Sequence, residues 1–436
     1  MKRIFLIGIL LLVFYQTTLF CQFLSNQTSL HCQHCLPEGI TFSSQAQIDS
    51  FQFNYPGCKK IIGDVKIDGD DITNLNGLIG LTSTGGLRII DNCSLMNLSG
   101  LDNLDSVGGN VIIGGNNNLN SISALDRLTF IPGDLEIGSF YSQNYHGNPL
   151  LTSLAGLNNI DSVGGSLNIF RCASLFDLTG LERLKQIGSG LGIGGMWSGG
   201  NSLQYLSGLD SLVSVGGGLD IVFNSGLQNL HGLEKLVQIG GDLSIYGNDS
   251  MTSLSGLVNL TSIGGGINLG NFLYYPGNLL LRDISELENV TINGDINIAG
   301  NHALSECAIE SICNYLANPI GTTLIYYNAP GCNTPEEVKQ ACDSLPVPEI
   351  SKPCRFIIHP NPFYETTMIC FELDTPAAIE VIIYDKLGKV VREFPRKEYQ
   401  PGDNSVTWQA EGLPAGIYLI GLQDGTTSVD RKIIKL

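Results

Sequence analysis

Positive charge, aromatic residues and catalytic motifs are all scarce in this sequence. Its 436 residues hold 23 Lys and Arg against 41 Asp and Glu, a formal charge of −18. A nucleic-acid partner requires a basic surface that displaces counterions, which this chain does not offer. The motifs of zinc proteases, serine hydrolases and nucleotide-binding loops are absent, and the six histidines are scattered. We therefore expect a protein that is not an enzyme, holds no cofactor or metal, and binds no nucleic acid.

Long apolar runs are also missing, except for one at the N-terminus. Lys2 and Arg3 precede the apolar residues 4–15, a run too short for a membrane anchor and typical of a signal peptide. We expect residues 1–21 to be removed, which leaves no transmembrane segment in the mature chain. Lipid attachment at Cys21 is the alternative, although the preceding Phe20 is larger than the residue usual there.

Cysteines are more numerous, and in an exported chain they favour disulfides. Near the N-terminus we expect Cys35 to pair with Cys58; a zinc site that also uses His31, Cys32 and His34 is the alternative, because Cys-x₂-Cys spacing alone is weak evidence. A second group of four allows three pairings: Cys307, Cys313, Cys332 and Cys342.

An internal repeat with a basic step of 24 residues dominates the centre of the chain. Its most regular part is Gly-Gly-x-Leu-x-Ile, as in 164–169, whose two apolar side chains share one face of a short strand. Before it, apolar residues recur at every third position, as in Leu98, Leu101 and Leu104. That period predicts a 3₁₀-like or extended segment rather than an α-helix. Stacked units of this kind predict a solenoid with a continuous leucine core.

An asparagine follows many of the strand isoleucines by three residues. The members of this column are Asn92, Asn116, Asn224, Asn248 and Asn301, with Asp70 and Cys172 in equivalent places. A stacked Asn can bond the backbone of its own turn and of the next. We interpret the column as a structural ladder in which Cys172 is a substitute and not a reactive thiol.

The outward positions of the strands are mostly small and polar, as in Asp64 with Lys66, Asn110 with Ile112, Asp134 with Glu136, Ser166 with Asn168, and Asp242 with Ser244. Aromatic residues gather instead in three insertions, where the step lengthens to 32, 28 and 29 residues. The candidate ligand-binding residues are therefore Tyr141, Tyr145, Trp197, Tyr274 and Tyr275. In the alternative, Phe140, Met196 and Phe272 occupy the ladder position and only plug the coil.

The 24-residue unit resembles the leucine-rich receptor L domain, over about Cys35 to Cys342. The resemblance implies a mainly β protein, a right-handed leucine-rich or β-helix-like solenoid, with a role in binding or adhesion and no shared catalytic residues. By analogy with other leucine-rich caps, it favours the pairs Cys307–Cys332 and Cys313–Cys342. We expect an N-terminal cap at 22–61, the repeats at 62–304, and a C-terminal cap at 305–345 with a helix that begins after Thr334.

A proline-rich linker at 346–354 ends the repeats, and short strands follow it. Their spacing predicts a small β-sandwich over 355–436 with strands at 355–359, 367–373, 379–385, 406–409, 417–422 and 429–436. We expect the glycines at 388 and 416 to form tight turns and the prolines at 360 and 362 to precede the first strand.

These residues resemble the type A sorting domain of type IX secretion, the Por secretion tail of Bacteroidetes-type bacteria. The matching motifs contain Pro360, Asn361, Pro362, Asp385, Gly388, Gly416, Tyr418, Lys432 and Lys435. The resemblance implies passage through the periplasm of a Gram-negative bacterium, recognition by the outer-membrane translocon, and removal of this domain by the surface processing machinery. We expect a secreted cell-surface recognition or adhesion protein with an unknown glycan or protein ligand. The alternative is a structural surface-layer component.

Overall fold

The computed structural model describes residues 34–435, except for 139–146, 196–199, 271–276, 345–355, 362, 374, 387–388 and 424–427. The chain divides into two compact units, one that ends at Asp343 and one that begins at Ser344, each with its own hydrophobic core. Among the helices in these ranges, none combines the length and the apolar character needed to cross a membrane.

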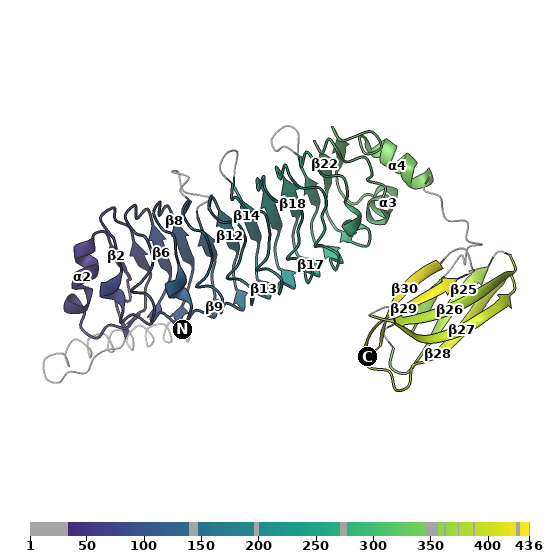
Figure 1. Ribbon diagram of the computed structural model, residues 1–436, viewed down its shortest axis with the longest axis horizontal. Helices are drawn as coiled ribbons and strands as arrows, with labels where there is room; N and C mark the ends of the chain where they lie inside the picture. The colour runs from purple at the N-terminus through teal and green to yellow at the C-terminus, as the bar shows by residue number, and fades with distance from the viewer. Residues whose placement is uncertain are drawn as a thin grey trace, which may run out of the picture. The chain divides into compact units, whose positions relative to one another are not determined.

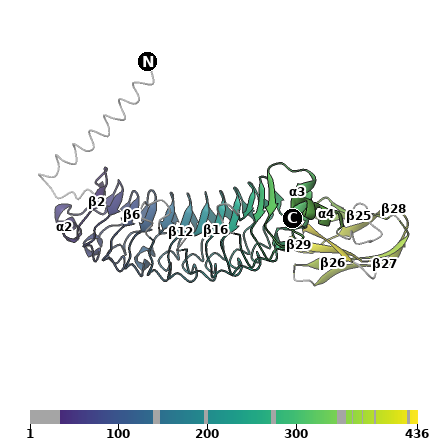
Figure 2. The same cartoon turned by 90° about the horizontal axis from the view of Figure 1, so that it is seen from above.

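The first unit is the predicted β-solenoid, whose coils stack side by side along one axis (Figure 1). Twelve described strands, one from each successive coil or cap, form a parallel sheet along one face (Figure 2). In order they are β2 (Ile40–Phe42), β4 (Val65–Ile67), β6 (Leu87–Ile90), β8 (Val111–Gly114), β10 (Leu135–Ile137), β12 (Leu167–Phe170), β14 (Leu191–Gly194), β16 (Leu219–Val222), β18 (Leu243–Tyr246), β20 (Ile267–Leu269), β22 (Ile296–Ala299) and β23 (Thr323–Tyr326).

Two-residue strands form a second wall of the solenoid. One sheet holds β1 (His34–Cys35), β3 (Lys60–Ile61), β5 (Ser83–Thr84) and β7 (Ser106–Val107). The other holds β9 (Phe130–Ile131), β11 (Ser162–Val163), β13 (Gln186–Ile187), β15 (Ser214–Val215), β17 (Gln238–Ile239), β19 (Ser262–Ile263) and β21 (Thr291–Ile292). All described pairings in these sheets are parallel and keep equivalent repeat residues opposite each other, as in Val163 with Ile187.

The segments with a leucine at every third position form tight 3₁₀-like turns, as predicted. The amide of Leu101 donates to the Leu98 carbonyl at 3.1 Å, and that of Leu104 donates to Leu101 at 2.9 Å. Full 3₁₀ turns occur at η1 (Asn76–Leu78), η2 (Ser123–Leu125) and η3 (Ser285–Leu287). Each turn directs one leucine inward, so the strand pairs and these leucines fill one continuous core.

Helices and disulfides close both ends of the solenoid. Helix α2 (Gln45–Asn54), which the sequence pattern did not predict, covers the N-terminal end with Ile48 and Phe51. At the other end lie α3 (Glu310–Ala317) and α4 (Pro335–Ser344). As expected, the Thr334 hydroxyl accepts a hydrogen bond from the Glu337 amide at 3.0 Å, which caps α4.

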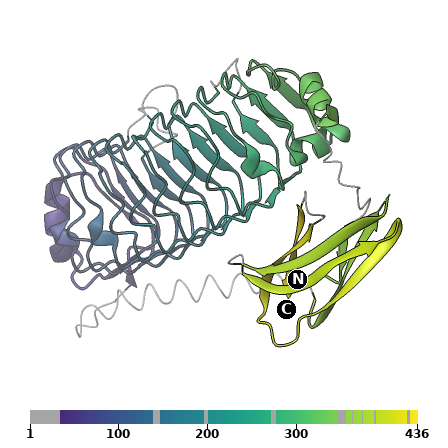
Figure 3. The ribbon, with the colours of Figure 1, turned by 45° about the vertical axis from the view of Figure 1, so that its right-hand side comes forward.

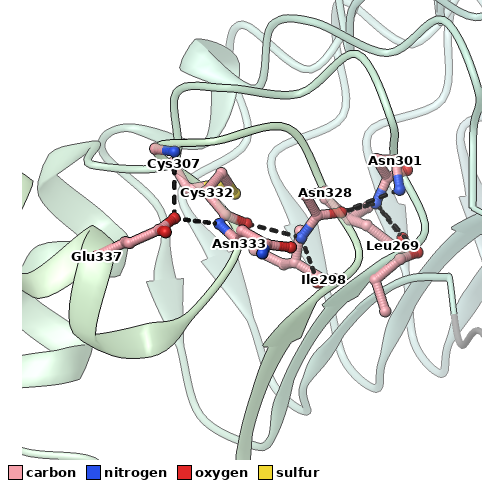
Figure 4. Close-up of a disulfide and its surroundings, with 10 residues drawn as sticks. Leu269, Ile298, Asn301, Cys307, Asn328, Cys332, Asn333 and Glu337 are labelled. Atoms are coloured by element: carbon pink, nitrogen blue, oxygen red, sulfur yellow. Dashed lines mark hydrogen bonds between the residues drawn. A yellow bond between two sulfur atoms is a disulfide. The ribbon is translucent and has the colours of Figure 1, made fainter.

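All three predicted disulfides are present: Cys35–Cys58, Cys307–Cys332 and Cys313–Cys342. The first excludes the zinc alternative, because that site required Cys35 and Cys58 as metal ligands. Figure 4 shows Cys307–Cys332 beside Asn328 and Asn301, so this disulfide lies at the end of the asparagine ladder.

The asparagine ladder is confirmed and is longer than predicted. In Asn248, the side-chain oxygen accepts the Asn224 amide at 3.0 Å, and its nitrogen donates to the Ile221 carbonyl at 2.8 Å. The same role belongs to Asn148, Asn201, Asn278 and Asn328, which the sequence interpretation missed. Three of these follow the insertions, so the alternative that placed Phe140, Met196 and Phe272 in the ladder is wrong; those three residues lie outside the described ranges.

Two positions of the ladder hold a residue other than asparagine, at Gly69 and at Cys172. Asp70 is exposed, and it is the amide of Gly69 that donates to Asn92, so the placement of Asp70 in the ladder was wrong. The shorter step of 22 residues between these coils accounts for the shift. Cys172 does substitute for Asn: its amide donates to Asn201 at 2.8 Å, and burial raises the pKa of its thiol to about 12.

The second unit consists of two antiparallel sheets that share one core (Figure 3). One contains β24 (Ile357–His359), β25 (Thr366–Leu373) and β28 (Gly402–Gln409); the other contains β27 (Val390–Tyr399), β26 (Ala377–Asp385), β29 (Gly416–Gln423) and β30 (Ser428–Lys435). Strand β27 was not predicted. Its side chains are largely exposed, and Pro395 lies at a register shift in its pairing with β26, features that protect a sheet edge.

Candidate functional site

The three insertions all leave the solenoid at the corner that follows the main strands. The residues that flank them are glycines: Gly138 and Gly147, Gly195 and Gly200, and Gly270 and Gly277. Gly270 and Gly277 are in direct contact, so the chain returns to the point where it left. We call this corner the loop edge: it consists of the residues that directly follow each main strand, from Gly138 after β10 to Tyr327 after β23. The predicted ligand-binding residues Tyr141, Tyr145, Trp197, Tyr274 and Tyr275 lie outside the described ranges.

The spacing of the insertions along the loop edge follows from the order of the strands. They come after β10, β14 and β20, so the second and third are three strands apart, as predicted. With about 4.8 Å between neighbouring strands, three steps are about 14 Å. Two regular coils, those of β16 and β18, lie between the second and third insertions, and one, that of β12, lies between the first and second.

The regular coils of the loop edge carry bulky residues in a strained backbone position. In seven coils of the solenoid, five of them on the loop edge, the residue just before the ladder position has a left-handed φ between 56° and 73°. Three of these residues are glycine: Gly115, Gly247 and Gly300. The others are Asp91, Arg171, Phe223 and Tyr327, each with φ 56°. A left-handed residue with a Cβ costs about 1–2 kcal/mol, and such strain tends to persist where function requires the side chain.

Two of these strained residues pack against a neighbouring aromatic ring, and for Tyr327 that ring is Tyr326. Phe223 packs edge to face against Tyr246, with 5.7 Å between ring centroids, and lies on the bare backbone of Gly247. The Phe170 ring covers Gly192 of the neighbouring strand and is 6% exposed. Arg and aromatic residues are the types that dominate binding energies at interfaces.

The coil that follows β14, which carries the second insertion, departs from the repeat in two further ways. The ladder is interrupted there, because the buried side-chain oxygen of Asn224 has no hydrogen-bond partner in the described part of the chain. In the same coil Tyr205 stands where eight other coils place an Asn, Asp or Ser that accepts the amide two residues later. Tyr205 is 51% exposed and contacts Phe176, which is 46% exposed, with ring centroids 5.4 Å apart.

Some side chains on the outer face of the main sheet stabilise the fold, a role that we did not predict from the sequence. The first residue of each polar pair accepts a backbone amide from the next coil; the Asp134 oxygen, for example, accepts the Ser166 amide at 2.8 Å. The same bond is made by Asp64, Asn110, Ser166 and Asp242. These residues form a second ladder at the glycine corner, so they are part of the scaffold. Only the second members, such as Glu136 and Asn168, remain as outer-face side chains.

The second unit, from Ser344 onward, contains the predicted sorting motifs and is called the sorting unit below. Within it, Asn361 holds the C-terminal strand β30 in place. Its side-chain oxygen accepts the Ile434 amide at 3.0 Å, and its nitrogen donates to the Lys432 carbonyl at 3.4 Å. The Phe363 amide donates to Ile434 at 3.0 Å. Lys432 is exposed, and Lys435 is partly exposed. The sequence motif around Asn361 and the terminal motif therefore meet in space.

Other sorting-motif residues form the turns. The Asp385 carboxylate accepts the Lys389 amide at 3.0 Å, and the Tyr418 hydroxyl donates to the Pro414 carbonyl at 2.7 Å. Gly416 begins strand β29, while Gly412 supplies the left-handed turn residue before it. Pro360 follows strand β24 and does not precede it, contrary to expectation. Pro362 and Gly388 lie outside the described ranges.

Residues 357–436 match the family described as the secretion system C-terminal sorting domain. The match starts at the first residue of β24 and confirms the predicted sorting tail. It indicates handling by the type IX secretion machinery and export to the cell surface or beyond. A comparison with curated proteins found no significant match.

Proposed function

We propose that this exported protein acts by recognition or adhesion at the cell surface, through the loop edge of its solenoid, and that it catalyses no reaction. The observation that carries the proposal is the set of bulky left-handed residues there. Glycine occupies the same position at no steric cost in three coils, yet Arg171, Phe223 and Tyr327 occupy it in others. Phe223 and Tyr327 also make ring contacts within the solenoid, with Tyr246 and Tyr326. Backbone strain of this kind clusters at functional sites, which supports a binding role for this corner.

The arrangement of the three insertions supports the same role. They emerge from one corner, over five strand steps or roughly 24 Å, with the regular coils of Arg171 and Phe223 between them. Loops carried on a rigid scaffold are the usual location of binding residues. The likeness of the repeat to the receptor L domain favours a binding role as well.

A structural surface component is the second candidate. The small polar outer face and the two side-chain ladders would suit a rod whose task is to extend from the cell. This alternative does not account for the strained side chains of the loop edge or for the exposed pair Phe176 and Tyr205.

Substitution of the strained residues by glycine separates the two candidates. We expect Arg171→Gly to leave the free energy of unfolding unchanged or raise it by up to about 1 kcal/mol, since the relief of backbone strain exceeds the entropy that glycine adds to the unfolded chain. Phe223→Gly also removes the ring contact with Tyr246, so its net change should stay within about 1 kcal/mol of zero. Binding, measured on glycan arrays and by pull-down with the full chain, should fall. Asp91→Gly is the matched control for strain relief away from the insertions, because Asp91 follows β6, two strands before the strand that precedes the first insertion.

Trp197→Ala together with Tyr274→Ala tests the insertions directly. We expect loss of binding with a change in stability of about 0.5 kcal/mol or less. A large loss of stability in the glycine variants and in the alanine variant, with no ligand found for the parent chain, would leave the structural candidate in place.

A further inference from the structure

The C-terminal cap contains a pocket that is separate from the loop edge. It lies where α3 packs on the turn between η3 and β21, and its volume is about 350 Å³. Pockets that bind small molecules usually have volumes of about 300–1,000 Å³. Its walls are formed by residues 288–292, by one side of α3, and by Asn318 and Ile320 after that helix.

The polar side of this pocket is acidic and rich in acceptors. Glu288 and Glu310 supply two carboxylates, and three asparagines supply amide groups, while no Lys, Arg or His lines the pocket. Neither carboxylate forms an ion pair with a described residue. The charge of the walls is therefore complementary to a cation.

A buried hydroxyl in the wall of the pocket also lacks a partner. Ser311 is 8% exposed, and its Oγ forms no hydrogen bond within the described structure. A buried hydroxyl without a partner costs about 1–3 kcal/mol. A ligand that hydrogen-bonds to Ser311 would remove this cost, which is an argument for an occupant that is independent of the carboxylates.

The remaining walls are apolar, so the pocket is a poor site for a bare metal ion. Val290, Ile292 and the Tyr315 ring are each less than 8% exposed, whereas Ile320 is 64% exposed. The volume corresponds to roughly twelve water molecules at about 30 Å³ each, far more than one cation occupies. A cation with an apolar stem would satisfy both sides of the pocket.

We propose that this pocket binds a primary alkylammonium group, with its nitrogen at Glu288, Glu310 and Ser311 and its methylene stem against the apolar wall. Two sources share this chemistry: a free diamine and the lysine side chain of a polypeptide. The site is separate from the loop edge, so the proposal does not depend on the recognition function argued above.

Calorimetric titration of the full chain tests the proposal. The probes are cadaverine, Nα-acetyl-lysine methylamide, and 1,5-pentanediol as the uncharged counterpart of cadaverine. We expect saturable binding of at least one amine and binding of the diol at least about tenfold weaker. Stronger binding of cadaverine would assign a free diamine, and stronger binding of the lysine derivative would assign a protein side chain.

Four variants locate the binding. Glu288→Gln and Glu310→Gln should each weaken the Kd of the amine by about tenfold or more, and Ser311→Ala should weaken it several-fold. Glu306→Gln, an exposed acid close in sequence but outside the pocket, controls for general attraction by the acidic surface. Melting temperatures confirm that each variant is folded. The absence of saturable binding of both amines up to about 10 mM, or an equal loss in Glu306→Gln, would overturn the proposal.

Discussion

The solenoid and the sorting unit organise their β-strands in opposite ways. In the solenoid each coil bonds to its neighbours through parallel strands and two side-chain ladders, as between Asn224 and Asn248. In the sorting unit the sheets are antiparallel, and the last strand is held by Asn361 from 73 residues away. Contacts between neighbours keep damage local, whereas contacts between the ends of a domain make it depend on its last residues.

The two units also differ in how they are closed. The solenoid has two open ends, each covered by a helical cap with disulfides. The core of the sorting unit is enclosed between two sheets instead. This comparison predicts where each unit should fail.

The largest effect should come from the C-terminal strand. Deletion of Lys432–Leu436 removes four paired residues of β30 and the buried side chain of Ile433, so the sorting unit should unfold and surface display should be lost. The solenoid should keep its own unfolding transition. Calorimetry and protease accessibility on intact cells measure both results.

Charge substitutions separate unfolding of this unit from loss of recognition. Lys432→Gln with Lys435→Gln keeps Ile433 in the core, so the unit should stay folded while display falls. Lys386→Gln is the control, since Lys386 is an exposed lysine in a turn of the same unit. Normal display of the deletion variant would contradict the role assigned to β30.

The cap disulfide Cys307–Cys332 should give the next largest effect. Both sulfurs are fully buried beside the last residues of the ladder (Figure 4), so replacement of both cysteines by alanine should lower the free energy of unfolding by about 2–5 kcal/mol. Chemical denaturation of the oxidised protein measures the change. Cys93→Ala, at an exposed cysteine, is the control and should have little effect. Equal stability of the double variant and the parent would show that the cap does not close the core.

The ladder itself should be the next most sensitive feature. Asn248→Ala leaves the Asn224 amide and the Ile221 carbonyl without partners in the core, which should cost about 2–4 kcal/mol. Asn120→Ala, at an exposed position in another coil, should cost less than about 0.5 kcal/mol. Hydrogen exchange should show the loss of protection confined to the neighbouring coils. A cooperative loss across the whole solenoid would contradict the local character of its contacts.

The repeat made much of the solenoid predictable. One coil with Leu-x-Ile and a following Asn was enough to infer the sheet, the core and the ladder, because each coil has the same environment. The prediction failed where this environment changes. A count of three residues from Ile137 reaches Phe140 in the insertion, whereas the ladder residue, Asn148, comes only after it.

Features without a repeated pattern were harder to predict. The exposed strand β27 has no apolar alternation, and Pro395 disguises it further. The left-handed backbone at Arg171 and Phe223 could not be inferred from these two residue types. Glycine at the same position in other coils was the signal in the sequence that indicated it. The acceptor role of Asp134 depends on the distance to the next coil, which no single repeat reveals.

The smallest effect should be a gain in stability at Cys172. Its sulfur lies 3.6 Å from the Phe170 carbonyl and 4.0 Å from the Ile137 carbonyl, weak contacts in the place where other coils use an amide. In Cys172→Asn the side-chain nitrogen should donate to both carbonyls, and its oxygen should accept the Asn148 amide. One added net hydrogen bond is worth about 1 kcal/mol, or a rise in Tm of about 1–3 °C. Because burial raises the thiol pKa to about 12, Cys172 in the parent should resist alkylation at pH 8, while the exposed Cys93 reacts. That labelling pattern establishes that the variant fills a buried site. A loss of stability in Cys172→Asn would show that this coil, which lies between the first two insertions, has been shaped around sulfur and differs from the regular ladder.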